Sequence, residues 1–233
     1  MPSQTEVEAV LNILNTTYPT LAMHEVHGGD PFRMLVAVIL SQRSRDSVTV
    51  PLAAQLFEHI ITAADLDRMP LEELTDRIRP STFYQQKAKA LKELAHILVT
   101  QYQGKVPQTE EQLLALPRVG RKTANIILTT FFNTPQIAVD THVHRITYRL
   151  GWTHTKLSLL KRGRHRGSPQ QDEMPTVEET ERQLTTLIPK RFHSIVNRVF
   201  VAHGQTICFP KIPKCSTCPI EKYCQKRGVT TQQ

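Results

Sequence analysis

The residues with the clearest potential for covalent chemistry are Lys122 and Asp140. Lys122 follows a short turn at residues 117–120, and Asp140 comes eighteen residues later, directly after the apolar segment 137–139. A neutral lysine amine is a nucleophile, and a carboxylate stabilises positive charge and moves protons. Taken singly, a helix lysine is a solvated charge, and an aspartate before a threonine is an N-cap. Their joint occurrence beside a turn suited to phosphate indicates covalent amine chemistry on nucleic acid.

The turn lies between two helices that we expect within residues 112–132. Apolar residues precede it, and Ala124, Ile127 and Leu128 recur at helical spacing after it. Pro117 and Gly120 punctuate the join, which predicts a tight hairpin of two helices. Gly120 lets the backbone approach a partner closely, and the amides that open the second helix form a phosphate site.

The four cysteines of the chain fall within seventeen residues, as Cys208-x6-Cys215-x2-Cys218-x5-Cys224. Disulfides that staple a fold would be spread through it, so this clustering favours a metal site. Four thiolates bind either tetrahedral Zn²⁺ or a [4Fe–4S] cluster. Zinc ribbons pair two close Cys-x2-Cys knuckles across a spacer, and only one close pair occurs here. The spacing therefore predicts a structural [4Fe–4S] cluster, with zinc as the alternative.

The chain is basic, which makes phosphate a plausible partner. Lys and Arg exceed Asp and Glu by 29 − 21 = 8, and the pI is near 9.5. Between the first two cysteines, Lys211 and Lys214 stand among prolines that stiffen the loop, so we expect their charges to face a phosphate backbone. A second basic stretch, 161–175, is broken by Gly and Pro and is either a nucleic-acid-facing arm or a solvated loop.

Targeting signals are not evident in the sequence. No apolar run approaches the ~20 residues that span a bilayer. Residues 1–10 lack the basic region and apolar core of a secretory signal. We therefore expect a monomer with no membrane partner, in a cytosolic, reducing location, associated with the nucleoid if the source is prokaryotic.

Helical periodicity predicts an all-α fold that positions these residues. An N-terminal helix places Val7, Val10, Leu11 and Leu14 on one face. Residues 32–40 are almost continuously apolar, which suits a helix buried on all sides. Their length alone also allows a buried strand, and the lack of two-residue alternation elsewhere decides for helix. Further helices are expected at 48–57, 70–78, 86–102, 141–150, 177–187 and 191–202.

The segments LPRVGRKTA and VDTHV, together with the cysteine spacing, resemble the endonuclease III family of helix-hairpin-helix DNA glycosylases over nearly the whole chain. The resemblance implies two lobes. A six-helix barrel lobe covers 26–134 with the helix-hairpin-helix near 112–132, and a helical lobe made of 1–25 and 135–233 carries the cluster loop 208–224. It also implies a partner, double-stranded damaged DNA.

The resemblance implies which loops touch DNA. In the family, one loop fills the gap left by an extruded base; Arg43 aligns with the filling position and Gln42 is its neighbour. An ordinary interhelical loop is the alternative. Phe83 takes the position of an apolar wedge that unstacks a base step, and core burial is the alternative. Thr82 replaces the usual glycine. The remaining residues expected at the DNA are Pro117, Arg118, Val119, Gly120, Arg121, Thr123 and His142, the last with a structural role as its alternative.

The resemblance also implies a bifunctional DNA glycosylase/AP lyase. Lys122 would attack the sugar C1′ of a flipped nucleotide and form a Schiff base, β-elimination would nick the strand, and Asp140 would stabilise the cationic sugar. Oxidised pyrimidines of the thymine glycol type are the expected substrates. Adenine-excising relatives have a glutamate where this chain has Ala37, and thymine-mismatch relatives have a tyrosine in place of Lys122. Leu114 replaces an acid of the best-studied branch.

Two other functions remain open from the sequence. One is a monofunctional glycosylase for uracil or mismatched thymine, against which Lys122 argues. The other is a non-catalytic iron–sulfur DNA-binding protein that keeps the hairpin and the cluster, against which the intact Lys122 and Asp140 argue.

Overall fold

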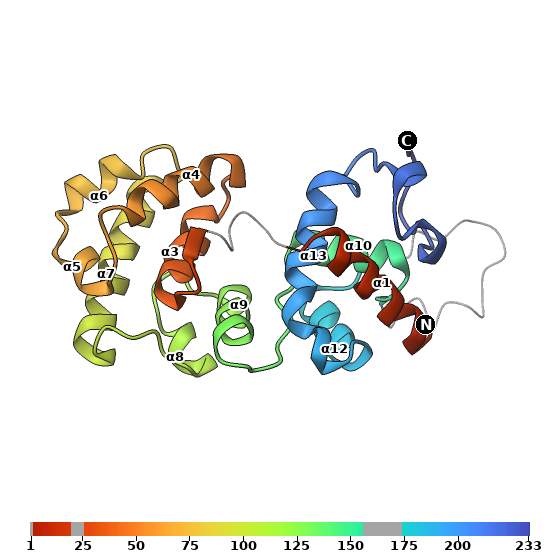
Figure 1. The fold of residues 1–233 in the computed structure, drawn as a ribbon, viewed down its shortest axis with the longest axis horizontal. Coiled ribbons are helices and arrows are strands. Elements are labelled where there is room, and N and C mark those ends of the chain that lie inside the picture. The colour runs from red at the N-terminus through yellow and green to blue at the C-terminus, as the bar shows by residue number, and fades with distance from the viewer. Residues whose placement is uncertain (1, 20–25, 156–173) are drawn as a thin grey trace. The chain divides into compact units, whose positions relative to one another are not determined.

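The computed structural model describes residues 2–19, 26–155 and 174–233. These residues contain helices and no strand, so the predicted all-α fold is confirmed. The chain divides into two compact units (Figure 1): one spans 20–134, and the other combines 1–19 with 135–233. The predicted basic stretch 161–175 falls almost entirely outside the described residues. No helix in the described part of the chain is long and apolar enough to cross a bilayer.

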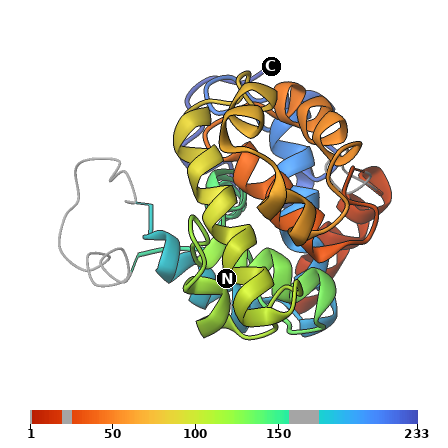
Figure 2. The same ribbon diagram turned by 90° about the vertical axis from the view of Figure 1, so that its left-hand side faces the viewer.

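The unit 20–134 packs around helix α3 (Pro31–Ser41). Its residues from Phe32 to Leu40, Arg33 excepted, are buried, as the continuous apolar run predicted. The helix begins at Pro31 because Asp30 caps it, with Oδ1 accepting from the Arg33 amide at 2.8 Å. Helices α4 (Asp46–Phe57), α7 (Tyr84–Tyr102) and α9 (Arg121–Phe131) pack against α3. Figure 2 shows the helices of this unit from a second direction.

Three shorter helices complete this unit. Helices α5 (Ala63–Arg68) and α6 (Leu71–Arg77) pack on α7, and α8 (Glu110–Leu114) pairs with α9. Sequence periodicity missed α5, because only Ala63 and Leu66 of its six residues are buried. Its signal was the capping box, in which Thr62 and Asp65 bind each other's backbone amides.

The other unit is built on helix α13 (His193–Thr206), which follows the 3₁₀ turn η2 (Lys190–Phe192). Helices α1 (Gln4–Thr17) and α10 (Thr141–Leu150) pack against it, and α12 (Val177–Leu187) adds Leu184 to the same core. The predicted apolar face of α1 is fully buried. Two further 3₁₀ turns, η3 (Cys215–Thr217) and η4 (Glu221–Tyr223), shape the cysteine loop.

Candidate active site and cysteine pocket

The hairpin of α8 and α9 presents a short surface turn. Leu116 and Val119 are buried and anchor the turn to the core, while Arg118, Gly120 and Arg121 are exposed. Arg118 has a left-handed backbone with φ of 59°, which reverses the chain. Gly120 is the N-cap of α9 and offers no side chain to the first amides of that helix. The turn therefore has the form of a backbone anion site with two exposed arginines beside it.

Lys122 is the second residue of α9 and its side chain is exposed, next to this turn. The position suits a nucleophile that must reach a bound partner. Two neighbours expected at the DNA, Val119 and Thr123, have side chains that are only 5% and 4% exposed. Because their side chains pack inward, only their backbone groups are available for the contacts expected from the sequence. Pro117, by contrast, is half-buried in the turn.

Asp140 caps helix α10 in the other unit. Its Oδ1 accepts from the amides of His142 and Val143, both at 2.9 Å, which confirms the N-cap interpretation. Asp140 itself is half-buried. Nη2 of Arg145 lies 3.2 Å from Nδ1 of His142. The same Nη2 donates a hydrogen bond to the Cys208 carbonyl at 3.0 Å. The cap and the cysteine loop are therefore linked through Arg145.

Loops of the unit 20–134 bring four predicted DNA residues together. Gln42 Nε2 donates to the Arg118 carbonyl at 2.9 Å, so the loop after α3 is tied to the hairpin turn. The guanidinium of Arg43 lies 5.9 Å from the centre of the Phe83 ring. Phe83 is 47% exposed, so its alternative interpretation as a core residue is wrong. Its left-handed backbone, with φ of 58°, turns the ring outward at the start of α7.

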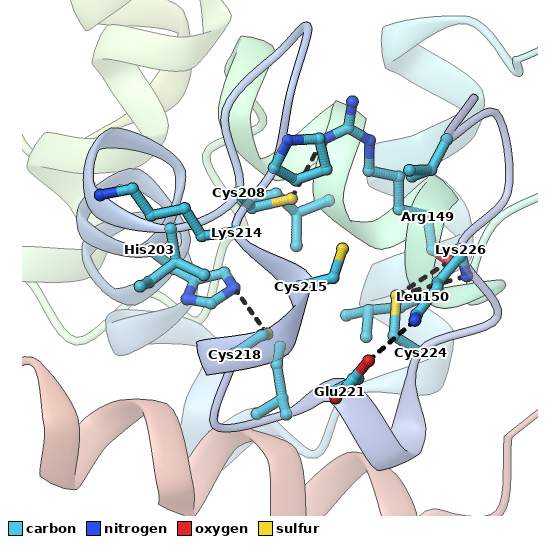
Figure 3. Close-up of a pocket in the computed structure, with 15 residues that line it drawn as sticks. Arg149, Leu150, His203, Cys208, Lys214, Cys215, Cys218, Glu221, Cys224 and Lys226 are labelled. Atoms are coloured by element: carbon cyan, nitrogen blue, oxygen red, sulfur yellow. Dashed lines mark hydrogen bonds and ion pairs between the residues drawn. The ribbon is translucent and has the colours of Figure 1, made fainter. Parts of the chain in front are cut away.

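All four cysteines line one pocket, although they come from separate turns (Figure 3). Cys208 follows α13, Cys215 opens η3, and Cys218 and Cys224 follow η3 and η4. Their sulfur atoms point into a common space (Figure 3). A pocket lined by four thiols is a donor set for soft metals. In the described part of the chain, no three His, Cys, Asp or Glu side chains are grouped to hold one metal ion.

Groups that donate hydrogen bonds surround these sulfurs. Arg149 Nη1 donates to Cys208 Sγ at 3.1 Å, and the Lys226 amide donates to Cys224 Sγ at 3.4 Å. His203 Nε2 lies 3.6 Å from Cys218 Sγ. Burial lowers the pKa of His203 to about 4, with a further contribution from Arg145, so the ring is neutral at pH 7. The N–H donors of Arg149 and Lys226 stabilise negative charge on sulfur.

Three of the four thiols resist ionisation when no metal is bound. Burial raises the pKa of Cys218 to about 11, and burial also raises the pKa of Cys215 and Cys224. A metal centre must therefore displace protons on binding, and it supplies the positive charge that the pocket needs for four thiolates. The residues fit a thiolate-bound metal group.

The basic loop between the first two cysteines is bound on its inner side by a buried arginine. Arg149 is buried and donates to the carbonyls of Phe209 at 2.8 Å and Pro210 at 2.7 Å. Lys211 and Lys214 remain exposed on the outside of this loop, and Lys214 Nζ lies 5.4 Å from the centre of the Phe209 ring. Both predicted lysines thus stand at the surface of the loop that starts at the cysteine pocket.

Comparison with known proteins places this arrangement in a family. Residues 36–167 match the model of the HhH-GPD superfamily base excision DNA repair protein. Endonuclease III of Thermotoga maritima is 42% identical over 196 residues, which cover 84% of this chain and 83% of that protein. The chain belongs to the endonuclease III family. As a member of it, the chain is a DNA glycosylase and AP lyase of base excision repair.

Two solved endonuclease III structures share the fold over nearly the full length. The first is a non-covalent endonuclease III–DNA complex, with a TM-score of 0.79 and 32% identity, covering 97% of each chain. The second is a trapped endonuclease III–DNA covalent intermediate, with a TM-score of 0.77 and 31% identity, also covering 97% of each chain.

Sequence reasoning missed two buried cations that organise these loops, Lys87 and Arg149. Lys87 is fully buried and Arg149 is 6% exposed. A signal for each was present. Lys87 precedes Leu91 and Leu94 by four and seven residues, and Arg149 follows Ile146 by three, so both lie on the apolar side of their helices. A cation at an apolar position of the helical repeat indicates a buried, hydrogen-bonded role.

Replacing Gly120 with alanine tests the backbone anion site. A Cβ at this position meets nothing within 4 Å, and the φ of −94° suits any residue. Alanine is a poorer N-cap than glycine but loses less chain entropy, so we expect Gly120→Ala to change the free energy of unfolding by less than ~1 kcal/mol. The methyl group blocks close approach of a phosphate, so affinity for duplex DNA with an abasic analogue should fall about tenfold, as for one lost charge-assisted hydrogen bond.

Fluorescence anisotropy measures this affinity, and thermal unfolding of the same samples is the control. Wild-type affinity in Gly120→Ala would contradict the assignment of the turn as a phosphate site.

Proposed function

We propose that this endonuclease III family enzyme removes oxidised pyrimidines of the thymine glycol type from duplex DNA, with Lys122 as nucleophile and Asp140 as the catalytic carboxylate. The observation that carries the proposal is the exposed amine of Lys122 in the first turn of α9, directly after the hairpin turn. A nucleophile at this point lies beside the phosphate contact that would orient the damaged strand.

The proposed reaction begins on a flipped nucleotide. The lone pair of Lys122 Nζ forms a bond to the sugar C1′, and the C1′–N bond breaks with its electrons leaving on the base, which takes up a proton. Opening of the sugar ring gives a protonated Schiff base. Loss of a C2′ proton then expels the 3′ phosphate and nicks the strand, and water hydrolyses the imine to restore the amine.

Asp140 supports the charge changes in these steps. A carboxylate stabilises the cationic sugar as the base departs and accepts or returns protons. Because the amides of His142 and Val143 both bind Oδ1, the orientation of this carboxylate is fixed before substrate arrives. A fixed carboxylate needs no reorganisation during the reaction.

In this proposal, the DNA contacts are made by side chains at the protein surface. Arg43 and Gln42 would fill the space of the flipped nucleotide, and Phe83 would wedge between neighbouring bases. Arg118 and Arg121 at the hairpin, and Lys211 and Lys214 on the cysteine loop, would contact phosphates. The exposure of Arg43, Phe83 and these four basic residues supports such contacts.

We also propose a [4Fe–4S] cluster held by Cys208, Cys215, Cys218 and Cys224. Four thiols around one pocket support it, and the occurrence of one close Cys-x2-Cys pair, where a zinc ribbon has two, favours the cluster over zinc. When bound, the cluster supplies four metal–sulfur bonds that stiffen the loop of Lys211 and Lys214. A reducing, cytosolic location close to chromosomal DNA suits both the thiolates and the substrate.

The nucleophile is tested by borohydride trapping on duplexes that contain thymine glycol or an abasic site. We expect the wild-type enzyme to form a covalent adduct with both, because borohydride reduces the Schiff base. Lys122→Ala removes the amine and should lose the adduct and at least ~10³-fold of the strand cleavage.

Lys105→Ala, at an exposed lysine in the loop after α7, is the control and should trap like the wild type. An adduct only at the abasic site would keep the lyase step and contradict the pyrimidine specificity. No adduct with either duplex would contradict the amine mechanism and favour a monofunctional glycosylase.

The variant Asp140→Asn distinguishes the N-cap role of Asp140 from the catalytic role of its negative charge. Asparagine also accepts amide hydrogen bonds at an N-cap, so we expect the thermal stability to stay near that of the wild type. Base release from thymine glycol duplexes should fall by ~10²- to 10⁴-fold, because the charge is lost. Asp140→Ala is the matched variant that also removes the cap and should cost a further ~1 kcal/mol of stability. Undiminished base release by Asp140→Asn would rule out the catalytic role.

Elemental analysis tests the cluster. The purified enzyme should contain about four iron atoms per chain and absorb broadly near ~400 nm. Cys218→Ser should lose most of the iron, while Ser216→Ala, at an exposed neighbour, should keep it. Stoichiometric zinc without iron in freshly purified protein would contradict the cluster assignment.

A further inference from the structure

Among the described residues of the unit 20–134, five non-glycine residues have a left-handed backbone, and three of them lie in the loops expected at the DNA. Arg43, Phe83 and Arg118 each have a left-handed conformation, with φ of 56°, 58° and 59°, although none is glycine. Such conformations are unfavourable for residues with a Cβ and persist when the surrounding structure enforces them. All three side chains are exposed, so their own packing does not supply the restraint. Buried groups that form hydrogen bonds with these loops must therefore restrain the three backbone conformations.

Lys87 of α7 is the main group beneath them. Its side chain is 0% exposed, and its Nζ donates to the carbonyls of Leu40 and Gln42, both at 2.7 Å. The same nitrogen bonds to Ser81 Oγ at 2.8 Å and approaches Ser44 Oγ at 3.3 Å. An ammonium has three N–H donors, so these four oxygens saturate it. One buried cation therefore binds the backbone at the end of α3, the Ser44 side chain on the other side of Arg43, and the residue that precedes Thr82.

Further bonds extend this network to the surface. Ser44 Oγ accepts from the Thr82 amide at 3.0 Å, which joins the loop of Arg43 to the loop of Phe83. Ser81 Oγ also donates to the Leu40 carbonyl at 3.0 Å. Gln42, whose carbonyl binds Lys87, donates through its side chain to the Arg118 carbonyl at 2.9 Å. Each of the three left-handed turns is thus fixed directly or through one intermediate residue.

Burying the Lys87 ammonium lowers the stability of the fold. Every hydrogen-bond partner of Lys87 Nζ among the described residues is a carbonyl or a hydroxyl, and no carboxylate pairs with it. Burial, reinforced by the charge of Arg118, lowers the pKa of Lys87 to about 8. A buried charge without a counter-ion destabilises a fold relative to an apolar side chain of similar size. Its place in the structure is better explained by the geometry that it imposes.

We propose that Lys87 is a positioning residue for damage recognition: it fixes the loops at 41–44 and 81–83 so that Arg43 and Phe83 project together into the duplex. This inference rests on the proposed DNA contacts of those two residues. Lys87 itself is fully buried and touches no substrate. Its effect on the enzyme passes through the backbone that it binds.

Lys92 provides a matched control on the same helix. Its ammonium also binds backbone carbonyls, those of Leu66 at 3.0 Å, Met69 at 2.7 Å and Asp67. These carbonyls belong to the end of α5, away from the three left-handed turns. Lys87→Met and Lys92→Met both replace an ammonium on carbonyls with an apolar chain of similar length. A difference between the two variants in DNA binding then reports on the loops.

The experiment uses the full-length enzyme and a duplex that carries a tetrahydrofuran abasic analogue opposite 2-aminopurine. Anisotropy gives the Kd, and the 2-aminopurine fluorescence at saturating enzyme reports whether side chains enter the gap. We expect Lys87→Met to raise the Kd by about ten- to a hundredfold, as for lost hydrogen bonds to a charged group, and to lose most of the fluorescence change. Lys92→Met should match the wild type in both.

Kinetics add a second readout. On a true abasic site, Lys87→Met should raise the enzyme concentration for half-maximal single-turnover cleavage by the same factor, with the saturated rate within about threefold of wild type, because Lys122 is intact. Wild-type Kd and fluorescence in Lys87→Met would overturn the positioning role, as would equal losses in Lys92→Met. If the wild-type enzyme itself neither binds nor cleaves the abasic duplex, the proposed function fails instead.

Ser44→Ala keeps the proposal testable if Lys87→Met does not fold. This variant removes the acceptor of the Thr82 amide and leaves the bonds of Lys87 to Leu40, Gln42 and Ser81 in place. We expect a Kd about three- to tenfold above wild type and a reduced 2-aminopurine signal. Circular dichroism confirms that the variant is folded. A folded Ser44→Ala enzyme with wild-type Kd and signal would overturn the proposal.

Discussion

Buried cations that donate to backbone carbonyls are the interaction on which the exposed loops depend. Lys87 binds the carbonyls of the loop after α3, and Arg149 binds the carbonyls of Phe209 and Pro210 at the start of the cysteine loop. In each unit, the buried cation lies beneath exposed basic residues that the sequence assigned to DNA. A carbonyl bound from below turns its peptide group and leaves the side chains on the outer face. The two buried cations thus position the loops that carry the exposed basic residues.

The cysteine pocket adds a second restraint to the same loop. Burial raises the pKa of Cys215, Cys218 and Cys224, hydrogen-bond donors from Arg149 and Lys226 already face two of the four sulfurs, and His203 lies beside a third. The environment is thus prepared for thiolates before a metal group supplies the compensating charge. Since Arg149 binds Cys208 Sγ and the next two carbonyls, the pocket and the basic loop share one anchor.

The sequence predicted the elements whose residues repeat clearly. Helix α3, the apolar face of α1 and the hairpin at α8 and α9 follow from apolar spacing and from Pro and Gly punctuation. It did not predict α5, whose short length buries two side chains, and it left open whether Phe83 is exposed as a wedge or buried in the core. That exposure depends on a left-handed backbone enforced by contacts with another loop, which are not local in sequence. Lys87 was missed because an isolated lysine in a helix is ordinarily solvated, and its acceptors lie 45 and 47 residues earlier in the chain.

The unit that carries the cysteines is discontinuous, with residues 1–19 packed onto a core formed by 135–233. Helix α1 buries its apolar face with α13, and the Gln233 backbone bonds to Pro213 and Ser216 of the cysteine loop. During synthesis, the unit 20–134 has all its core residues once residue 134 leaves the ribosome, and it can fold as a contiguous insert. Helix α1 emerges before the unit 20–134, but its partner α13 emerges after that unit. The order of translation therefore completes the cysteine pocket late, after the loops that Lys87 binds have formed.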